Sequence, residues 1–307
     1  MESLSIAEIA RIIGATPESL PDVCKSAIAE LDFRVERIEG DERDQIFEEV
    51  EKVLASELEV AGIHRHKRWE EGWTENLEEF VHNGYDLDSL VPKFVRPDRP
   101  VRFNGGYYRT ADPYFETNLV IVLRNWLFSR WFTDVEDVYE FGCGTSHNLV
   151  ALAKLFPEKN LHGLDFTEAS GKIVEALKEH HGFNIDGGLI DLFNPDPGLK
   201  LRPRSGIFTV GTLEQIGTKF DPFIELVMRS EPSVCINVET LWELYDNGDR
   251  FDDLARKYTD KRGYLHGLVD RLREHQKAGR IEILDLKRTF GSLFHEGYSY
   301  VVWRVCK

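Results

Sequence analysis

A glycine-rich turn follows a short apolar run at residues 138–146, where the sequence reads VYEFGCGTS. Gly142 and Gly144 lack a Cβ, so the backbone can turn tightly here and approach a ligand closely. A helix expected from about Ser146 would present free N–H groups and the positive end of its dipole to an anionic group. These residue types in this order predict a ligand-binding turn, with Glu140 at the end of the strand that precedes it.

Two further carboxylates stand at the ends of the next apolar runs. Asp165 closes the run Leu161–Asp165, and Asp191 lies in the run Gly188–Leu192. A carboxylate at a strand end can accept hydrogen bonds from both hydroxyls of a ribose, and dinucleotide-binding enzymes use an acid in this way. These acids therefore favour a ligand that contains a nucleoside, without choosing among such ligands.

Strands alternate with helices from about Asp137 onward, which is typical of a parallel, doubly wound α/β sheet. The expected strands are Val138–Phe141, Leu161–Asp165, Gly188–Leu192, Ile207–Gly211 and Val234–Val238. Two more β-rich runs, Ile281–Phe290 and Tyr298–Val305, are joined by only seven residues. Such a connection is too short for a helical crossover, so we expect these last two strands to pair antiparallel.

This pattern resembles the class I S-adenosylmethionine-dependent methyltransferases. Members of that family have a Rossmann-like, seven-stranded and mostly parallel sheet with a reversed last strand. The resemblance implies S-adenosylmethionine as the cofactor, held at Gly142, Cys143, Gly144 and Ser146, with Glu140 accepting a hydrogen bond from the methionine ammonium. The chain departs from the family at Ser146, where a third glycine is commonest.

The resemblance also gives roles to the later strand ends. It implies that Asp165, with Phe166 beside it, holds the ribose hydroxyls, and that Asp191 receives the adenine amino group. A neighbouring apolar side chain, Leu192 or Phe193, would then pack on the adenine ring.

A nicotinamide or flavin site is the main alternative for the glycine-rich turn. The dinucleotide fingerprint GxGxxG requires glycine where this chain has His147, and Glu140 stands where such folds usually keep an apolar residue. A cofactor-binding protein without catalysis would show the same strand-end acids. A DNA-binding regulator is a third alternative, because Ile6–Leu31 faintly resembles a helix-turn-helix; its second helix, Ser19–Leu31, contains only Lys25 as a basic residue.

Candidate catalytic residues follow the later strands. Methyl transfer is an in-line displacement in which the protein mainly supplies alignment, and a general base helps when the acceptor is a hydroxyl. His295, between the last two strands, is the first candidate for this base, although an exposed turn histidine is the competing interpretation. Glu214, after the fourth strand, is the second candidate, and His147 and His266 are the other histidines considered. Glu239 ends the fifth strand, facing either solvent or the acceptor.

The acceptor is expected to be a small molecule methylated on oxygen, such as a sugar, a nucleotide sugar or a secondary metabolite. The segment Lys261–Tyr264 interrupts a helix expected over Asp249–Gln276 and combines basic residues with a tyrosine. It could bind an acceptor phosphate or sugar, although a solvated break between helices is the simpler interpretation. Glu214, Glu239 and Glu243 could gather a metal ion, but the spacing of these residues is not that of a metal site, and we predict none.

The methyltransferase-like domain is expected over residues 133–307, behind a mainly helical region of residues 1–132 that covers the active site or forms a homodimer contact. Within this region, residues 114–132 are apolar nearly all round and should form a buried helix. Paired glycines precede Tyr107, which suggests a lid whose tyrosine contacts the cofactor. An ordinary turn with packed tyrosines is the alternative.

Bulk composition restricts the partners. The 307-residue chain has a formal net charge of -16, so it lacks the basic excess on which nucleic-acid binding depends, and no nucleic-acid partner is expected. The four cysteines lie far apart, which fits reduced thiols in a cytoplasmic protein. The most apolar stretch, Leu119–Phe132, contains two arginines and is too short to span a bilayer, so no membrane association is expected.

Overall fold

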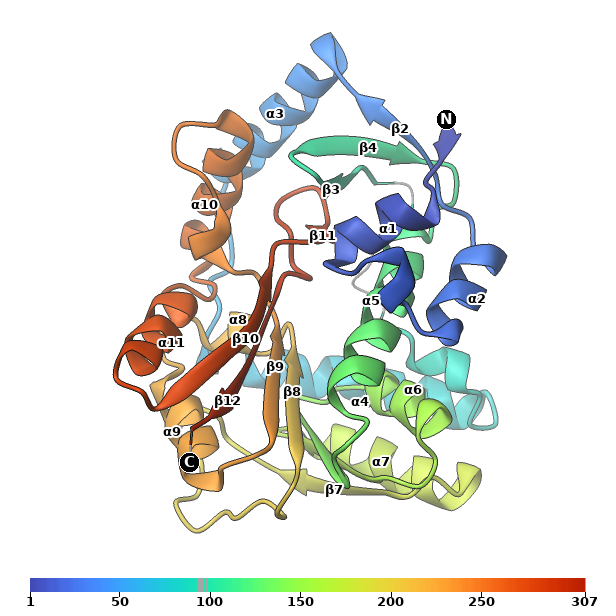
Figure 1. Cartoon of the computed structure of the whole chain (residues 1–307), viewed down its shortest axis with the longest axis vertical. Coiled ribbons are helices and arrows are strands. Elements are labelled where there is room, and N and C mark those ends of the chain that lie inside the picture. Colours follow the sequence, from blue (N-terminus) through green and yellow to red (C-terminus); the bar gives the residue numbers. More distant parts are fainter. Residues whose placement is uncertain (93–96, 98, 307) are drawn as a thin grey trace.

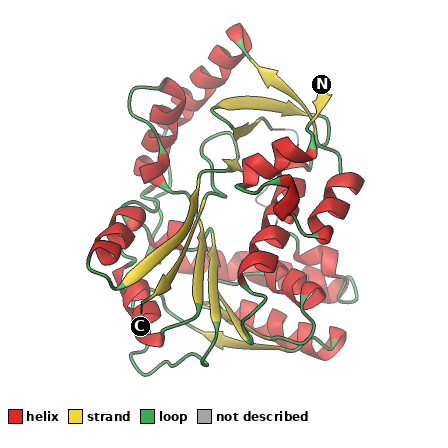
Figure 2. Ribbon diagram, in the orientation of Figure 1, coloured by secondary structure: helices red, strands yellow, loops and turns green. Residues whose placement is uncertain are grey.

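Two sheets and the helices packed on them make up the structure (Figures 1 and 2). It is a computed structural model that describes residues 1–92, 97 and 99–306. The larger sheet has seven strands in the order β10-β12-β9-β8-β5-β6-β7. In chain order they are β5 (Asp137–Phe141), β6 (Asn160–Asp165), β7 (Ile185–Leu189), β8 (Gly206–Val210), β9 (Val234–Val238), β10 (Ile281–Lys287) and β12 (Tyr300–Val305).

The directions of these strands confirm the expected α/β fold. The five strands from β7 to β9 are parallel to one another, whereas β12 pairs antiparallel with β9 on one side and with β10 on the other. β10 therefore runs with the parallel strands, and the last strand of the chain is the reversed one. The antiparallel pairing predicted from the short final connection is confirmed.

One strand lies earlier than the sequence pattern indicates. β7 covers Ile185–Leu189, whereas the apolar run placed it at Gly188–Leu192. β7 is an edge strand, and Leu189 at its end is 66% exposed. A Cβ on Gly187 would lie 3.2 Å from Val174 of the helix above it. Small residues suit this strand because its helix approaches closely, so hydrophobicity alone misplaced it.

Helices cover both faces of the large sheet (Figure 1). One face carries α5 (Phe115–Trp131), α6 (His147–Leu155) and α7 (Glu168–His181), and the other carries α8 (Leu213–Ile216), α9 (Asp221–Ser230) and α11 (Leu268–Lys277). Successive strand residues point to opposite faces. Val138 and Phe208 accordingly belong to the first core, and Tyr139 and Ile207 to the second.

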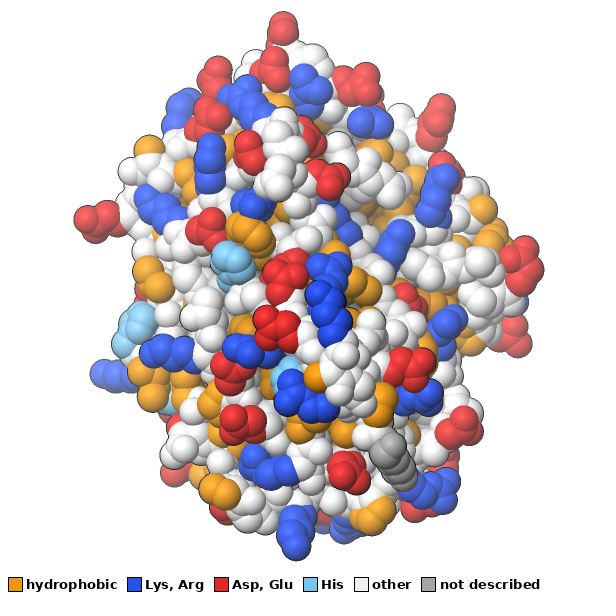
Figure 3. Space-filling view, turned by 60° about the vertical axis from the view of Figure 1, so that its left-hand side comes forward, with side chains coloured by type: hydrophobic (Ala, Val, Ile, Leu, Met, Phe, Trp, Pro, Cys, Tyr) orange, Lys and Arg blue, Asp and Glu red, His pale blue; other side chains and the backbone are white. Residues whose placement is uncertain are grey.

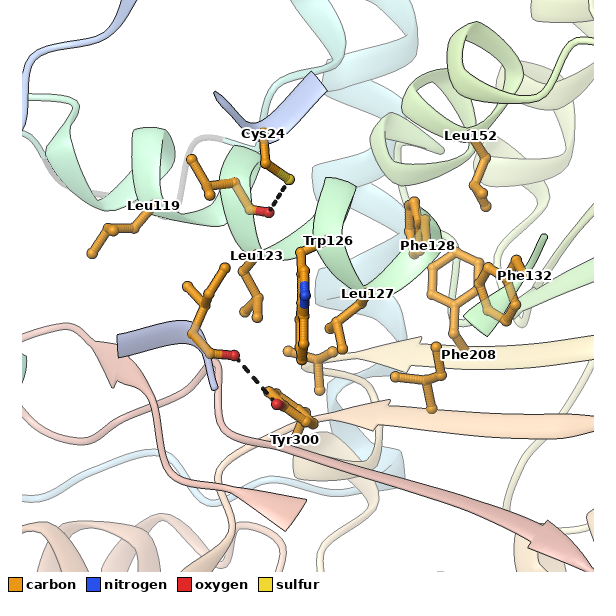
Figure 4. Close-up of a cluster of buried hydrophobic side chains, with 14 of the residues drawn as sticks. Cys24, Leu119, Leu123, Trp126, Leu127, Phe128, Phe132, Leu152, Phe208 and Tyr300 are labelled. Carbon is orange, nitrogen blue, oxygen red and sulfur yellow. Dashed lines mark hydrogen bonds between the residues drawn. The ribbon is translucent and has the colours of Figure 1, made fainter. Parts of the chain in front are cut away.

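The expected buried helix is confirmed as α5, which lies at the centre of the first core (Figure 4). Its Trp126 side chain is 1% exposed. The Cys24 thiol donates to the carbonyl of Val122 at 3.5 Å, and the Tyr300 hydroxyl donates to the carbonyl of Ile13 at 3.2 Å. These bonds tie α1 (Ile6–Ile13) and α2 (Asp22–Glu30) to the core. The segment that resembled a helix-turn-helix is thus packed into the fold on its apolar side.

The first 132 residues are mainly helical, as expected, but they also contribute four strands to a second, five-stranded sheet that the sequence did not reveal. Its order is β1-β2-β4-β3-β11, and its neighbouring strands pair antiparallel. The strands are β1 (Glu2–Ser3), β2 (Arg34–Ile38), β3 (Val101–Phe103), β4 (Gly106–Thr110) and β11 (Phe290–Gly291). These strands are short, and apart from the β3–β4 hairpin their partners are far apart in sequence, so local patterns did not reveal them. β11 comes from the connection between β10 and β12, so both parts of the chain build this sheet.

The expectation that Tyr107 contacts the cofactor from a mobile lid is wrong. Asn104 and Gly105 have φ values of 48° and 68°, and they form the tight turn between β3 and β4. Tyr107 lies in β4, is fully buried, and packs against Phe47 and Phe251. The paired glycines therefore serve a hairpin turn, which needs positive φ, rather than a moving segment.

Three more helices flank the two sheets: α3 (Gly40–Ala55), α4 (His66–His82) and α10 (Arg250–Arg262). α3 packs on α10, and α4 packs on α7. In the described part of the chain, no helix has both the length and the apolar character needed to cross a membrane. On the face shown in Figure 3, basic and acidic side chains are interspersed rather than separated into areas of one sign.

Candidate functional site

The glycine-rich turn follows β5 at the carboxyl edge of the large sheet, where open α/β sheets bind ligands. Gly142 and Gly144 have φ values of 74° and 50°, in the left-handed region. A Cβ on Gly142 would lie 2.3 Å from the side chain of Thr212, and one on Gly144 would lie 2.9 Å from Trp73. Both positions therefore require glycine for backbone conformation and for space.

Ser146 also has a left-handed backbone, with φ of 60°. Its hydroxyl is buried and has no hydrogen-bond partner. The left-handed conformation is higher in energy for serine than for glycine, because serine has a Cβ. A third glycine would therefore suit this position. Ser146 thus differs from the family pattern in its side chain, while its backbone has the conformation that a glycine would adopt.

Glu140, at the end of β5, is 1% exposed and only half satisfied. Its Oε1 accepts a hydrogen bond from the Asn148 amide at 2.8 Å, while its Oε2 is buried without a partner. Asn148 in turn accepts from the Arg124 guanidinium at 3.3 Å. Burial raises the pKa of Glu140 to about 8. An unpartnered buried oxygen is costly, and a donor such as a ligand ammonium group would satisfy it.

Asp165 holds the turn itself together. Its Oδ2 accepts from the backbone N–H of Gly144 at 2.9 Å, and its Oδ1 accepts from the backbone N–H and the hydroxyl of Thr167. Burial raises the pKa of Asp165, while these hydrogen bonds oppose the shift. Oδ2 keeps a free lone pair for a ligand hydroxyl, so Asp165 can serve the turn and a ribose together.

The residues expected around an adenine ring lie just beyond β7. Asp191 follows the strand, and its Oδ1 accepts from the backbone N–H of Phe193 at 2.8 Å. Leu192 packs in the second hydrophobic core. Phe193 packs against the same core, and its ring centroid also lies 6.2 Å from that of His66, so of the two apolar candidates it is the one near α4.

Helix α4 lies against these strand ends, which sequence patterns did not reveal. His66 stacks on Phe166 with ring centroids 4.1 Å apart, and Trp73 covers Gly144. The Glu70 carboxylate accepts from the backbone N–H groups of Glu168 and Ala169, the first two residues of α7. The aromatic residues of α4 were visible in the sequence, but nothing local indicated which surface they cover.

Two of the expected catalytic residues meet although 81 positions separate them. His295 Nε2 lies 3.9 Å from Glu214 Oε2, and Thr240 lies between the two side chains. The Thr240 hydroxyl donates to Glu214 Oε2 at 2.9 Å, and it lies 3.4 Å from His295 Nδ1. His295 is mostly buried, with a side chain 12% exposed, so it is not an exposed turn histidine.

Burial changes the protonation of this pair. It lowers the pKa of His295 to about 4 and raises the pKa of Glu214 to about 7. The histidine is therefore neutral at neutral pH, and the carboxyl group titrates there. A general base works best when its pKa is near the operating pH, so these shifts favour Glu214 over His295 for that task.

Glu239 has a structural position that neither sequence interpretation anticipated. Its side chain is fully buried, and its carboxylate accepts from the backbone N–H groups of Thr212, Leu213 and Glu214. It therefore caps the short helix α8 and fixes the backbone of Glu214.

The other histidines have separate surroundings. His147 begins α6, and burial lowers its pKa to about 3. His266 stacks on Trp242 with ring centroids 4.0 Å apart. Among the described residues, His, Cys, Asp and Glu side chains form no group of three or more that could hold a metal ion.

Neither a protein-family model nor the sequence of a curated protein matches the chain. Among solved structures it is similar to SpnF, a [4+2]-cyclase, with a TM-score of 0.47 and 15% identity over 76% of this chain and 77% of that chain. It is also similar to a SAM-dependent methyltransferase from Aquifex aeolicus, with a TM-score of 0.41 and 14% identity over 59% and 88% of the two chains. A third is NcsB1, an O-methyltransferase from neocarzinostatin biosynthesis, with a TM-score of 0.41 and 13% identity over 64% and 59%.

These identities are low and the TM-scores are below 0.5, so the fold is assigned from strand order and direction. Five parallel strands are followed by a pair whose last strand is reversed and lies between β9 and β10. This is the fold of the class I S-adenosylmethionine-dependent methyltransferases.

Proposed function

We propose that this protein is an S-adenosylmethionine-dependent methyltransferase that acts on a hydroxyl of a small-molecule acceptor, such as a sugar, a nucleotide sugar or a secondary metabolite. The observation that carries the proposal is the unpartnered, buried Oε2 of Glu140 beside a turn that needs two glycines. Fold alone does not define an activity, whereas this oxygen requires a donor in a defined place.

The residues of the cradle fit the parts of that cofactor. Glu140 would accept from the methionine ammonium, and the N-terminus of α6 would face its carboxylate. Asp165 would bind ribose through the lone pair left on Oδ2. Asp191 and Phe193 would bind the adenine at the end of β7.

The Glu214–His295 pair supplies the acceptor side. When bound, S-adenosylmethionine would supply a methyl group from its sulfonium, with a neutral thioether as the leaving group. Glu214 takes the hydroxyl proton, since burial places its pKa at about 7. His295, neutral at this pH, orients the hydroxyl by hydrogen bonding. Glu239 and Thr240 hold Glu214 in position.

Calorimetry with S-adenosylhomocysteine and NADH tests the cofactor. We expect S-adenosylhomocysteine to bind in the micromolar range and to raise the Tm, as any ligand of the native state does. Glu140→Gln should weaken binding about ten- to a hundredfold, because it removes the charge from a hydrogen bond worth about 1.5–3 kcal/mol. The control is Glu225→Gln, at an exposed position on α9. Binding of NADH but not of S-adenosylhomocysteine would overturn the proposal.

A further inference from the structure

A chain of polar contacts links the N-terminal part of the protein to the Glu214–His295 pair. The Arg65 guanidinium, just before α4, donates through Nη1 to Gln215 Oε1 at 2.5 Å. The Gln215 amide donates to Glu214 Oε1 at 3.1 Å. Arg65 is only 6% exposed, so its charge is placed inside the protein beside the proposed base.

A second guanidinium reaches the same place from the end of α10. The Arg262 guanidinium lies 4.9 Å from the ring of Tyr264, and that ring meets the His295 ring edge to face at 5.8 Å. The backbone N–H of Ala61 donates to the carbonyl of Arg262 at 2.7 Å, which holds this turn against the segment that leads to Arg65. The buried Nε of Arg262 has no hydrogen-bond partner, whereas the buried Nε of Arg65 lies 3.3 Å from Glu59 Oε2.

The charges here do not balance within the protein. Glu59 lies 3.3 Å from Arg65, but it also pairs with Arg68, and its side chain is 39% exposed. The remaining acid in this contact chain is Glu214, whose pKa burial raises to about 7. Within the described residues, Arg65 and Arg68 share the Glu59 carboxylate, and Glu214, beside Arg65 and Arg262, is partly protonated at neutral pH. This cluster of positive charge stands out because the chain as a whole has a net charge of -16.

We propose that Arg65 and Arg262 form an anion subsite of the acceptor pocket, so that the acceptor carries a carboxylate or a phosphate in addition to the hydroxyl that is methylated. This inference rests on the proposed function, because it takes Glu214 and His295 as the place of the hydroxyl. The acceptor would then have two polar groups: an oxyanion bound by Arg65 and Arg262, and a hydroxyl bound by Glu214.

Several physical reasons support an oxyanion there. Guanidinium groups bind carboxylate and phosphate through paired N–H donors, and an oxyanion would satisfy the free Nε–H of Arg262. The pKa of Arg65 is lowered, chiefly because burial disfavours its charge, and repulsion from Arg262 adds to this effect while Glu59 opposes it. A bound anion would offset that repulsion by attracting both guanidiniums. The positive charge of Arg262 also lowers the pKa values of Glu214 and His295, so an anion bound at the subsite would oppose this effect on the proposed base.

The experiment compares three probes that differ in one group: 3-hydroxybenzoate, 3-hydroxyphenyl phosphate and the neutral 3-hydroxybenzamide. Binding to the full chain is measured by calorimetry with and without saturating S-adenosylhomocysteine. We expect at least one of the two anions to bind about tenfold or more tightly than the amide, the gain typical of charge-assisted hydrogen bonds. The carboxylate and phosphate arms show which oxyanion the subsite prefers.

Variants locate the effect. Arg262→Gln and Arg65→Gln should each remove most of the preference for the anion, while Lys257→Gln, an exposed position on the same helix as Arg262, should keep it. Equal binding of anion and amide by the unmodified protein, or equal losses in Lys257→Gln and Arg262→Gln, would overturn the subsite. If S-adenosylhomocysteine fails to bind while the anion preference persists in its absence, the cofactor assignment is wrong and the subsite stands.

Discussion

Two mostly buried glutamates that follow the neighbouring strands β8 and β9 show how hydrogen-bond partners decide the role of a residue. Glu239 accepts three backbone N–H bonds and is thereby committed to holding α8. Glu214 has only side-chain partners, Thr240 and Gln215, and it lies within 3.9 Å of His295. The sequence offered Glu214 as a candidate base and left Glu239 facing either solvent or the acceptor. Residue type and place along a strand could be predicted, whereas the set of donors around each carboxylate depends on the fold.

The pH dependence of turnover should separate the two members of the pair. Glu214 must lose its proton to act as base, so turnover at saturating cofactor should rise with pH through about 7. Glu214→Gln should lower turnover about 10²–10⁴-fold and abolish this acidic limb. His295→Asn should lower turnover while the limb stays, because the pKa of His295, about 4, lies below the range tested.

The control for both variants is affinity for S-adenosylhomocysteine, which should be unchanged. If the acidic limb disappears in His295→Asn and remains in Glu214→Gln, the histidine is the base, as the sequence first suggested.

At the scale of elements, the sequence predicted the parts that repeat a local pattern and missed those defined by distant partners. The strands β5, β6, β8 and β9 lie where their apolar runs placed them, within a residue at each end. The five-stranded sheet was missed because its strands are short and one of them, β11, comes from the other end of the chain. The position of helix α4 could not be predicted either, because its contacts are with strand ends that lie far from it in the sequence.

Helix α4 should have to adjust when cofactor binds. The indole of Trp73 occupies the space next to Gly144 that a ligand needs to approach the turn. Because no ring must first be displaced, Trp73→Ala should increase the association rate of S-adenosylhomocysteine, measured in a stopped-flow absorbance competition assay. Binding should also change the fluorescence of the protein, and Trp73→Phe should lose that change.

Trp131→Phe serves as the control, because Trp131 ends α5 shortly before β5 begins, at the opposite edge of the sheet. It should keep both the association rate and the fluorescence change. Slower association in Trp73→Ala would show instead that the indole helps to hold the ligand.

Across the whole molecule, the fold concentrates buried carboxyl groups at one edge of the large sheet. Glu140, Glu214 and Glu239 all follow or end its strands, and burial raises the pKa of each, to about 8, 7 and 7. The parallel arrangement, predicted from the alternation of strands and helices, is what brings these ends together. Their burial could not be predicted, because it depends on α4 and on the loops that cover the edge.

This arrangement makes the stability of the unliganded protein fall as pH rises. A carboxyl whose pKa is about 8 in the native state and 4.5 when unfolded keeps its proton only in the native state between these values. The native state then binds more protons, so the free energy of unfolding decreases with pH by about 1.4 kcal/mol per pH unit for each such group. The stability from Glu140 is complete below pH 4.5 and is lost as pH rises through about 8.

Thermal unfolding between pH 7 and 8 should show this loss as a falling Tm. This pH range avoids the titration of His147 and His295. Their pKa values are lowered to about 3 and 4, so they make stability rise with pH, but only below about pH 6.5. Glu140→Gln cannot ionise, so its Tm should fall less steeply than that of the unmodified protein, while Glu225→Gln should match the unmodified slope. Equal slopes in all three proteins would mean that Glu140 is already ionised in the native state at pH 7, held as a carboxylate by Arg124 through Asn148.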